Sequence, residues 1–143
     1  MSTKSCYSIE PEVAGGFGEN TVISRPNGKI IVEKLHYEFQ GWLGDPILES
    51  VPCYIITTEL ASKMTASGLT GFSVDKVEVS ESDDFRLIQP DTVLPKFVWL
   101  KINGIAEEDD IALSDNLELV VSERALDILQ KSGMTHAEIV SYP

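Results

Sequence analysis

Cys53–Gly71 reads CYIITTELASKMTASGLTG, and Leu117–His136 reads LELVVSERALDILQKSGMTH, so one pattern occurs twice in the chain. Each copy has a short apolar run, then hydroxyl residues and an acid, then apolar residues at helical spacing, and finally a glycine. A hydroxyl side chain accepts hydrogen bonds from the free N–H groups at a helix start, and an acid there complements the helix dipole. The pattern therefore predicts two buried strands that lead directly into two short helices.

The glycines Gly68 and Gly133 predict where both helices end. Glycine adopts the left-handed conformation that commonly closes a helix, and the residue after it packs back onto the last turn. Leu69 and Met134 occupy that next position. We therefore expect the two copies to end in the same way, whether or not they arose by duplication.

A strand is predicted after each helix, so the chain contains two strand–helix–strand units. The alternation of the first of these strands slips at Asp75–Lys76, which indicates a bulge, and Asn103–Gly104 is a hairpin signal. Roughly five to seven strands with two short helices favour an α+β fold with a mainly antiparallel, mixed sheet. Alternating or β-prone runs predict strands at Ile31–Phe39, Phe72–Val79, Phe97–Ile102 and Ala137–Tyr142.

Three stretches are predicted to be loops of a single domain that spans residues 1–143. Residues 1–20 are polar and rich in glycine, which indicates a mobile or loop-like N-terminal arm. Gly41–Pro46, with the sequence GWLGDP, is expected to be a structured loop in which glycines frame Trp42. Glu81–Asp84, with the sequence ESDD, is expected to be a solvated loop.

Composition and charge limit the classes of partner. The chain has 143 residues, of which 43% are apolar, and its net charge is −12 from 23 acids and 11 bases. Such a charge repels nucleic acid and anionic membranes, and it favours either a basic protein partner or simple solubility. The sequence shows no apolar run of membrane-spanning length and no signal region, so we expect a cytoplasmic protein with Cys6 and Cys53 as free thiols.

No residue pattern indicates a catalytic, metal or cofactor site. The two histidines, His36 and His136, lack further ligands at a metal-site spacing. Gly71–Asp75 lacks the second glycine of a nucleophile elbow, and the acids that begin at Glu107 lack the spacing of a calcium loop. We therefore expect a protein that is not an enzyme and carries no cofactor.

Two blocks of the C-terminal part carry a family resemblance. Leu94–Asp110, LPKFVWLKINGIAEEDD, and Leu119–Leu129, LVVSERALDIL, resemble the tail of bacterial immunity-type proteins of polymorphic toxin systems, small uncharacterised proteins with a VSERALDIL-like block. Leu35–Asp45, LHYEFQGWLGD, resembles an upstream block of similar bacterial proteins. The resemblance implies a small cytoplasmic antidote that binds a cognate toxin and blocks it, and it offers no catalytic residue.

The candidate partner-binding residues are exposed acids and one tryptophan. Carboxylates are expected to fill a basic cleft of the partner in place of phosphates, and a loop tryptophan provides an apolar anchor. The alternatives are a structural or oligomeric accessory protein and a small enzyme of unrecognised type. The candidate residues are Trp42, Asp83, Asp84, Glu107, Glu108, Asp109 and Asp110.

Overall fold

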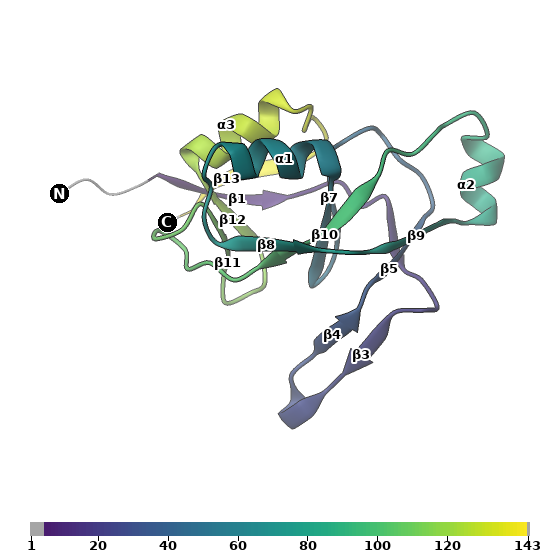
Figure 1. The fold of residues 1–143 in the computed structure, drawn as a ribbon, viewed down its shortest axis with the longest axis horizontal. Coiled ribbons are helices and arrows are strands. Elements are labelled where there is room, and N and C mark those ends of the chain that lie inside the picture. The colour runs from purple at the N-terminus through teal and green to yellow at the C-terminus, as the bar shows by residue number, and fades with distance from the viewer. Residues whose placement is uncertain (1–4, 143) are drawn as a thin grey trace.

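Two four-stranded sheets with the same internal plan pack against each other across a shared core (Figure 1). The computed structural model describes residues 5–142. The strand order is β6-β7-β10-β8 in the first sheet and β11-β12-β1-β13 in the second, and neighbouring strands are antiparallel throughout. The strands are β6 Ile47–Ser50, β7 Cys53–Thr57, β8 Phe72–Asp75, β10 Phe97–Ile102, β11 Ile111–Leu113, β12 Leu119–Ser122, β1 Cys6–Glu10 and β13 Glu138–Tyr142.

The two strand–helix–strand units are confirmed, and they are interlocked. In the first sheet β7 leads into helix α1 (Thr58–Ala66) and then into β8; in the second, β12 leads into α3 (Glu123–Lys131) and then into β13. The strand between the two strands of each unit comes from elsewhere in the chain, since β10 separates β7 from β8 and β1 separates β12 from β13. Equivalent positions of the two units lie 65 residues apart from Thr57 and Ser122 onward. The α+β class with mainly antiparallel sheets is therefore confirmed.

Both helices begin and end as the sequence predicts. The Thr57 hydroxyl accepts from the N–H of Leu60 at 3.1 Å, and the Ser122 hydroxyl accepts from that of Ala125 at 3.2 Å. Both closing glycines have positive φ, 70° at position 68 and 108° at position 133. In each case the next residue donates its N–H to the carbonyl five residues earlier, Leu69 to Met64 at 3.2 Å and Met134 to Leu129 at 3.1 Å. These are complete glycine-closed helix ends.

Replacing Gly68 or Gly133 with alanine is expected to lower the free energy of unfolding by about 1–2 kcal/mol. No atom lies within 4 Å of a Cβ added at either glycine, so the cost is confined to the left-handed backbone. Urea unfolding measures it. Gly16→Ala is the control, because its added Cβ also meets open space and its φ is not positive; losses equal to that control would contradict the assignment.

A second core lies on the other side of the first sheet. It joins β7 and β10 to a three-stranded sheet of order β2-β5-β9, in which β5 and β9 are parallel. Tyr37 and Phe39 of β5 are fully buried there and contact each other with ring centroids 5.0 Å apart. The strands are β2 Gly15–Phe17, β5 His36–Phe39 and β9 Glu78–Glu81.

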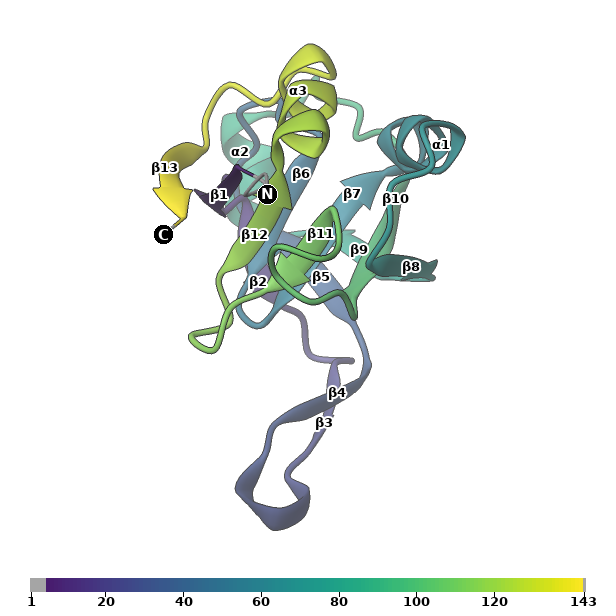
Figure 2. The same cartoon turned by 90° about the vertical axis from the view of Figure 1, so that its left-hand side faces the viewer.

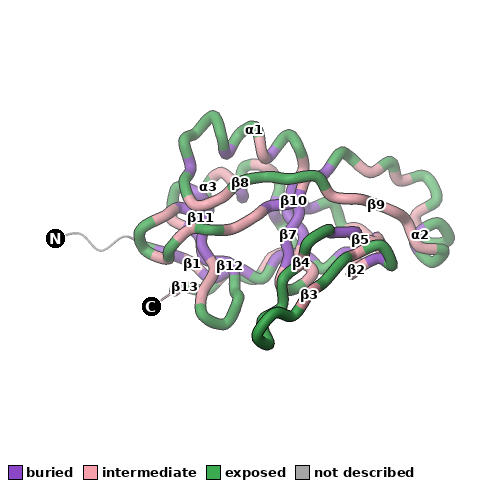
Figure 3. Tube along the Cα trace, turned by 60° about the horizontal axis from the view of Figure 1, so that its bottom comes forward, coloured by how far each residue is buried: buried purple, intermediate pink, exposed green. Residues whose placement is uncertain are grey.

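A two-stranded ribbon projects from this end of the molecule (Figure 2). It consists of β3 (Val22–Ser24) and β4 (Ile31–Lys34), joined by a 3₁₀ turn at Pro26–Gly28. Its strands pair only with each other among residues 5–142. Figure 3 shows the ribbon as largely exposed, in contrast to the buried centre of β7 and β10.

The expectation of a loop-like N-terminal arm is wrong for the residues that the structure describes. Residues 6–10 form β1, which lies between β12 and β13 with Cys6 and Ile9 buried. Ala14 is also buried, and Gly15–Phe17 pairs with β5. These polar and glycine-rich residues are ordered because distant strands supply their hydrogen-bond partners. Residues 1–4 lie outside the described part of the chain.

Three other local predictions differ from the structure. Glu81–Asp84 is not a loop, because Ser82 caps a third helix, α2 (Asp83–Ile88), by accepting from the N–H of Phe85 at 3.1 Å. The predicted strands 31–39 and 72–79 are each divided where the chain passes from one sheet to another, so the slip at Asp75–Lys76 marks the end of β8 and not a bulge, and the described residues contain thirteen short strands. Asn103–Gly104 does not form a tight hairpin, since β10 and β11 belong to different sheets.

Candidate binding surface

The candidate partner-binding residues divide between two ends of the molecule. Trp42, Asp83 and Asp84 lie at the end that carries α2, whereas Glu107–Asp110 precede β11 at the opposite end (Figure 1). Asp83 and Asp84 begin α2 and Trp42 bonds to Gln89, which follows it, so these three residues belong to one region that is separate from the acidic run. The two groups cannot form one continuous contact patch.

Gln89, the residue after α2, joins this helix to the loop of Trp42. Its side-chain oxygen accepts from the N–H of Trp42 at 2.6 Å, and its side-chain nitrogen donates to the carbonyl of Trp42 at 3.0 Å. The indole of Trp42 is half-buried, donates to the carbonyl of Asp45 at 2.9 Å and meets the ring of Phe97 edge-on at 6.1 Å. Trp42 therefore anchors its own loop and leaves only part of its ring for a partner.

An exposed apolar patch accompanies the acids of α2. Leu87, Ile88 and Val93 are 78%, 66% and 89% exposed, with Asp83 and Asp84 before them in the sequence and Asp91 between Ile88 and Val93. Sequence reasoning missed these apolar residues, although their position between an acidic run and Pro90 was a usable signal. The α2 surface, as we name it, consists of Asp83, Asp84, Leu87, Ile88, Asp91 and Val93.

The four acids at the opposite end have different environments. Glu107 and Glu108 are exposed, and Glu107 has a positive φ of 73°. The Asp109 carboxylate accepts from the N–H of Ile105 at 2.8 Å and so closes its own turn. Asp110 is only 8% exposed. We therefore leave Asp109 and Asp110 out of a surface that contacts a partner.

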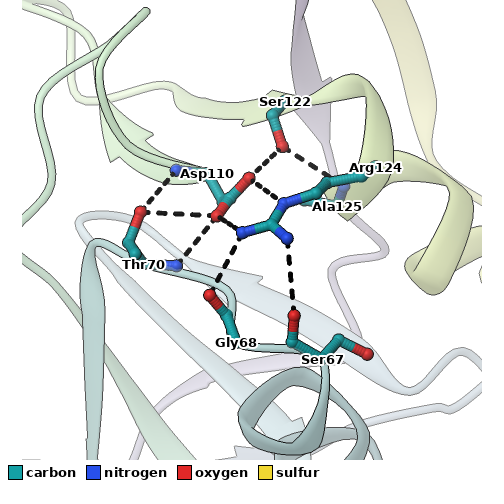
Figure 4. A network of polar contacts seen from close by, with 7 residues as sticks. All are labelled: Ser67, Gly68, Thr70, Asp110, Ser122, Arg124 and Ala125. Carbon is teal, nitrogen blue, oxygen red and sulfur yellow. Dashed lines mark hydrogen bonds and ion pairs between the residues drawn. The ribbon is translucent and has the colours of Figure 1, made fainter.

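The Asp110 carboxylate connects the end of α1 to the start of α3 (Figure 4). It accepts from the Arg124 guanidinium at 2.7 and 2.8 Å, from the Ser122 hydroxyl at 2.6 Å and from the N–H of Thr70 at 2.9 Å. Arg124 also donates to the carbonyl of Gly68 at 3.1 Å. The hydrogen bonds from Arg124 hold the pKa of Asp110 well below its usual value against the opposing effect of burial, and the hydrogen bonds from Ser122 and Thr70 lower it further.

Asp45 binds the residues that follow α3 as Asp110 binds those that follow α1. Its fully buried carboxylate accepts from the N–H of Thr135 at 3.2 Å, from the N–H of His136 at 2.8 Å and from Nδ1 of that histidine at 2.9 Å. Burial alone would raise the pKa of Asp45, but the hydrogen bonds from His136 and Thr135 hold it below its usual value. Thr135 lies 65 residues after Thr70, so a buried aspartate holds the same position in both units.

Glu12, Asp45 and His136 are the residues that could supply metal ligands, since one ligand atom from each lies within 4.8 Å of the others. Glu12 accepts from the N–H of Leu43 at 2.7 Å and from that of Asp45 at 3.2 Å. Its carboxylate thus already holds the backbone of the Trp42 loop. The geometry gives this cluster a structural role.

The remaining histidine, His36, and both cysteines are buried, whereas His136 is exposed. Nδ1 of His36 accepts from the N–H of Asn20 at 3.1 Å, while its Nε2 lies 2.7 Å from the Ser80 hydroxyl. Cys6 and Cys53 are buried free thiols, and burial raises the pKa of Cys53 to about 11. A thiol with so high a pKa is a poor nucleophile at neutral pH.

Neither the protein-family models nor the curated proteins contain a match to this chain. In residues 5–142, no helix has the length and apolar character needed to cross a membrane.

Proposed function

We propose that the protein is a non-catalytic binding protein that inhibits a basic partner protein, and that it serves as an immunity protein against a cognate bacterial toxin. The observation that carries the proposal is the α2 surface, where exposed apolar side chains and carboxylates gather on one projecting element. Protein interfaces combine apolar anchors with a polar rim in this way.

The carboxylates of the α2 surface are available to a partner. Asp83, Asp84 and Asp91 are exposed and take part in no ion pair among residues 5–142. The net charge of −12 attracts a basic partner over a long range, which speeds encounter. Once the partner is bound, Leu87 and Ile88 lose contact with water, and this burial slows dissociation.

Inhibition follows from occupying a basic cleft. An enzyme that acts on phosphate-bearing substrates has a cationic active site, and carboxylates can take the place of the phosphates. The short helix α2 is held rigidly by the buried ring of Phe85 and by the hydrogen bonds of Gln89 to Trp42. A rigid binding element loses little conformational entropy on association, which favours tight binding.

The double variant Asp83→Asn, Asp84→Asn is expected to slow association with the partner about tenfold and to abolish protection in cells. The partner for this test is the product of the gene next to this one, expressed from an inducible promoter so that it arrests growth by itself. Growth rescue by co-expression and stopped-flow association rates are measured. The amides keep the shape of the side chains and the hydroxyl cap of Ser82.

The matched control is Glu107→Gln, Glu108→Gln, which removes the same charge at the opposite end of the molecule. It should leave association and rescue as in the wild type. If this control loses rescue and the α2 variant keeps it, the binding surface lies at the other candidate cluster. If the neighbouring gene product does not bind the wild-type chain, the immunity function itself is wrong.

A further inference from the structure

The ribbon of residues 22–34, here called the arm, exposes apolar side chains. Val22, Ile23, Ile30 and Ile31 are 39% to 53% exposed, although β-branched residues of this kind usually face a core. A two-stranded ribbon is marginally stable by itself, and exposed apolar clusters mark sites of contact with other molecules. The arm therefore has the character of an unoccupied binding element.

The arm carries charge of the opposite sign to the rest of the chain. It contains Arg25, Lys29 and Lys34 against the single acid Glu33, whereas the whole chain has a net charge of −12. Lys34 is paired with Glu78 at 3.2 Å. Arg25 and Lys29, at the tip, belong to no ion pair among the described residues. Two cations are thus presented at the end of an apolar ribbon.

The α2 surface has the complementary composition. It combines three exposed apolar residues with three aspartates that form no ion pair within residues 5–142, while the single cation of α2, Arg86, is paired with Glu81 at 3.9 Å. The arm cannot reach this surface within its own molecule, because it points away from the body and away from α2 (Figures 1 and 2). An arm from another copy has no such restriction.

We infer that the arm of one copy docks on the α2 surface of a second copy, and that two copies exchange arms in a closed dimer. When the arm of each copy binds the α2 surface of the next copy, the copies form an open chain. When two copies bind each other's α2 surfaces, the assembly closes as a dimer in which both arms and both α2 surfaces are occupied. The dimer uses the same surface as the proposed function but does not rest on it. Dimer formation and partner binding compete.

Charge-swap variants and sedimentation equilibrium test the dimer. Arg25→Glu, Lys29→Glu on the arm and Asp83→Lys, Asp84→Lys on α2 should each raise the dissociation constant of the dimer about tenfold or more. The two pairs combined should restore the wild-type value to within about threefold, because opposite charges again face each other. Glu107→Lys, Glu108→Lys changes the net charge as much as the α2 pair does, and it should leave the dimer intact.

A wild-type chain that stays monomeric up to about 0.5 mM overturns the inference. So does an open series of larger assemblies, or a failure of the combined variant to recover. An arm variant with the dissociation constant of the wild type would mean that the arm's cations do not face acids, as in a contact of arms with arms, and would overturn it as well. Leu87→Ser, which leaves the helix start unchanged, must also weaken the dimer. Growth rescue by the arm variant separates the two proposals, since partner binding does not need the arm.

Discussion

Replacing Asp110 with alanine is expected to lower the free energy of unfolding by about 3 kcal/mol. The change removes the acceptor for the Arg124 guanidinium, for the Ser122 hydroxyl and for the N–H of Thr70. Arg124 regains water because its side chain is largely exposed, so the loss falls mainly on the groups around the buried carboxylate. The network joins the end of α1 to the start of α3, and both ends should loosen together (Figure 4).

Urea unfolding of Asp110→Ala, Arg124→Ala and the double variant measures the coupling between the two side chains. The double variant should lose less than the sum of the single losses, since either change breaks the same ion pair. Asp115→Ala is the control, because that aspartate is exposed in a loop of the same half of the chain. A loss at Asp110 no larger than at Asp115 would contradict the structural role.

Acid should weaken the wild-type protein through the same carboxylate. The pKa of Asp110 is lowered in the folded state, chiefly by the Arg124 guanidinium, so the unfolded chain takes up the proton first. The stabilisation is fully present above the unfolded pKa of about 3.9, and it is lost as the pH falls towards the folded value. Asp110→Asn should therefore show a smaller fall in the free energy of unfolding between pH 6 and pH 3, roughly the range over which the unfolded aspartate titrates.

The helices could be predicted because the interactions that define their ends are local. Thr57 bonds to the residue three positions later, and Leu69 bonds to the residue five positions earlier. Residues close together in the sequence therefore determine both ends of each helix. The same local reasoning missed α2, whose serine cap and first-turn acids follow the same rule but looked like a solvated loop.

The position of β1 could not be predicted from its own residues. Its partners, β12 and β13, lie more than a hundred positions away, with Cys6 opposite Ser122 and opposite Tyr142. The polar segment that forms β1 becomes an inner strand only through these distant pairings, and no pattern within residues 1–20 predicts them. The alternation slip at Asp75–Lys76 was visible, but its meaning, a strand that passes from one sheet to another, depends on the rest of the fold.

The candidate site likewise has residues whose exposure could be predicted from the sequence and residues whose burial could not. Asp83 and Asp84 were expected to be exposed because charged runs are solvated, and the structure exposes them. Within the run that ends at Asp110, however, composition cannot tell an exposed acid from a buried one. Leu87 and Ile88 were missed for the converse reason, since apolar residues of a helix normally form its buried face, as Phe85 does in α2.

Gly71→Ala is expected to have the largest effect of any single substitution considered, a loss of about 4 kcal/mol or failure to fold. An added Cβ would overlap the carbonyl oxygen of Ile111 and would lie 2.8 Å from Cβ of Asp109 and 3.0 Å from Cα of Gly104. Two of these neighbours are backbone atoms, which cannot move aside by a rotation of a side chain. The carbonyl of Gly71 also accepts from the N–H groups of Asn103 and Gly104, both at 2.9 Å, so the segment cannot shift away.

Gly44→Ala separates this overlap from backbone strain. Gly44 has φ of 108°, close to the 97° of Gly71, yet no atom lies within 4 Å of its added Cβ. Urea unfolding of the two variants should therefore differ by about 2–3 kcal/mol, the part due to overlap alone. Equal losses would show that the left-handed backbone accounts for the whole effect. The equivalent position in the second unit is His136, whose side chain bonds to Asp45, so the need for glycine comes from the neighbours of Gly71 and not from the helix end.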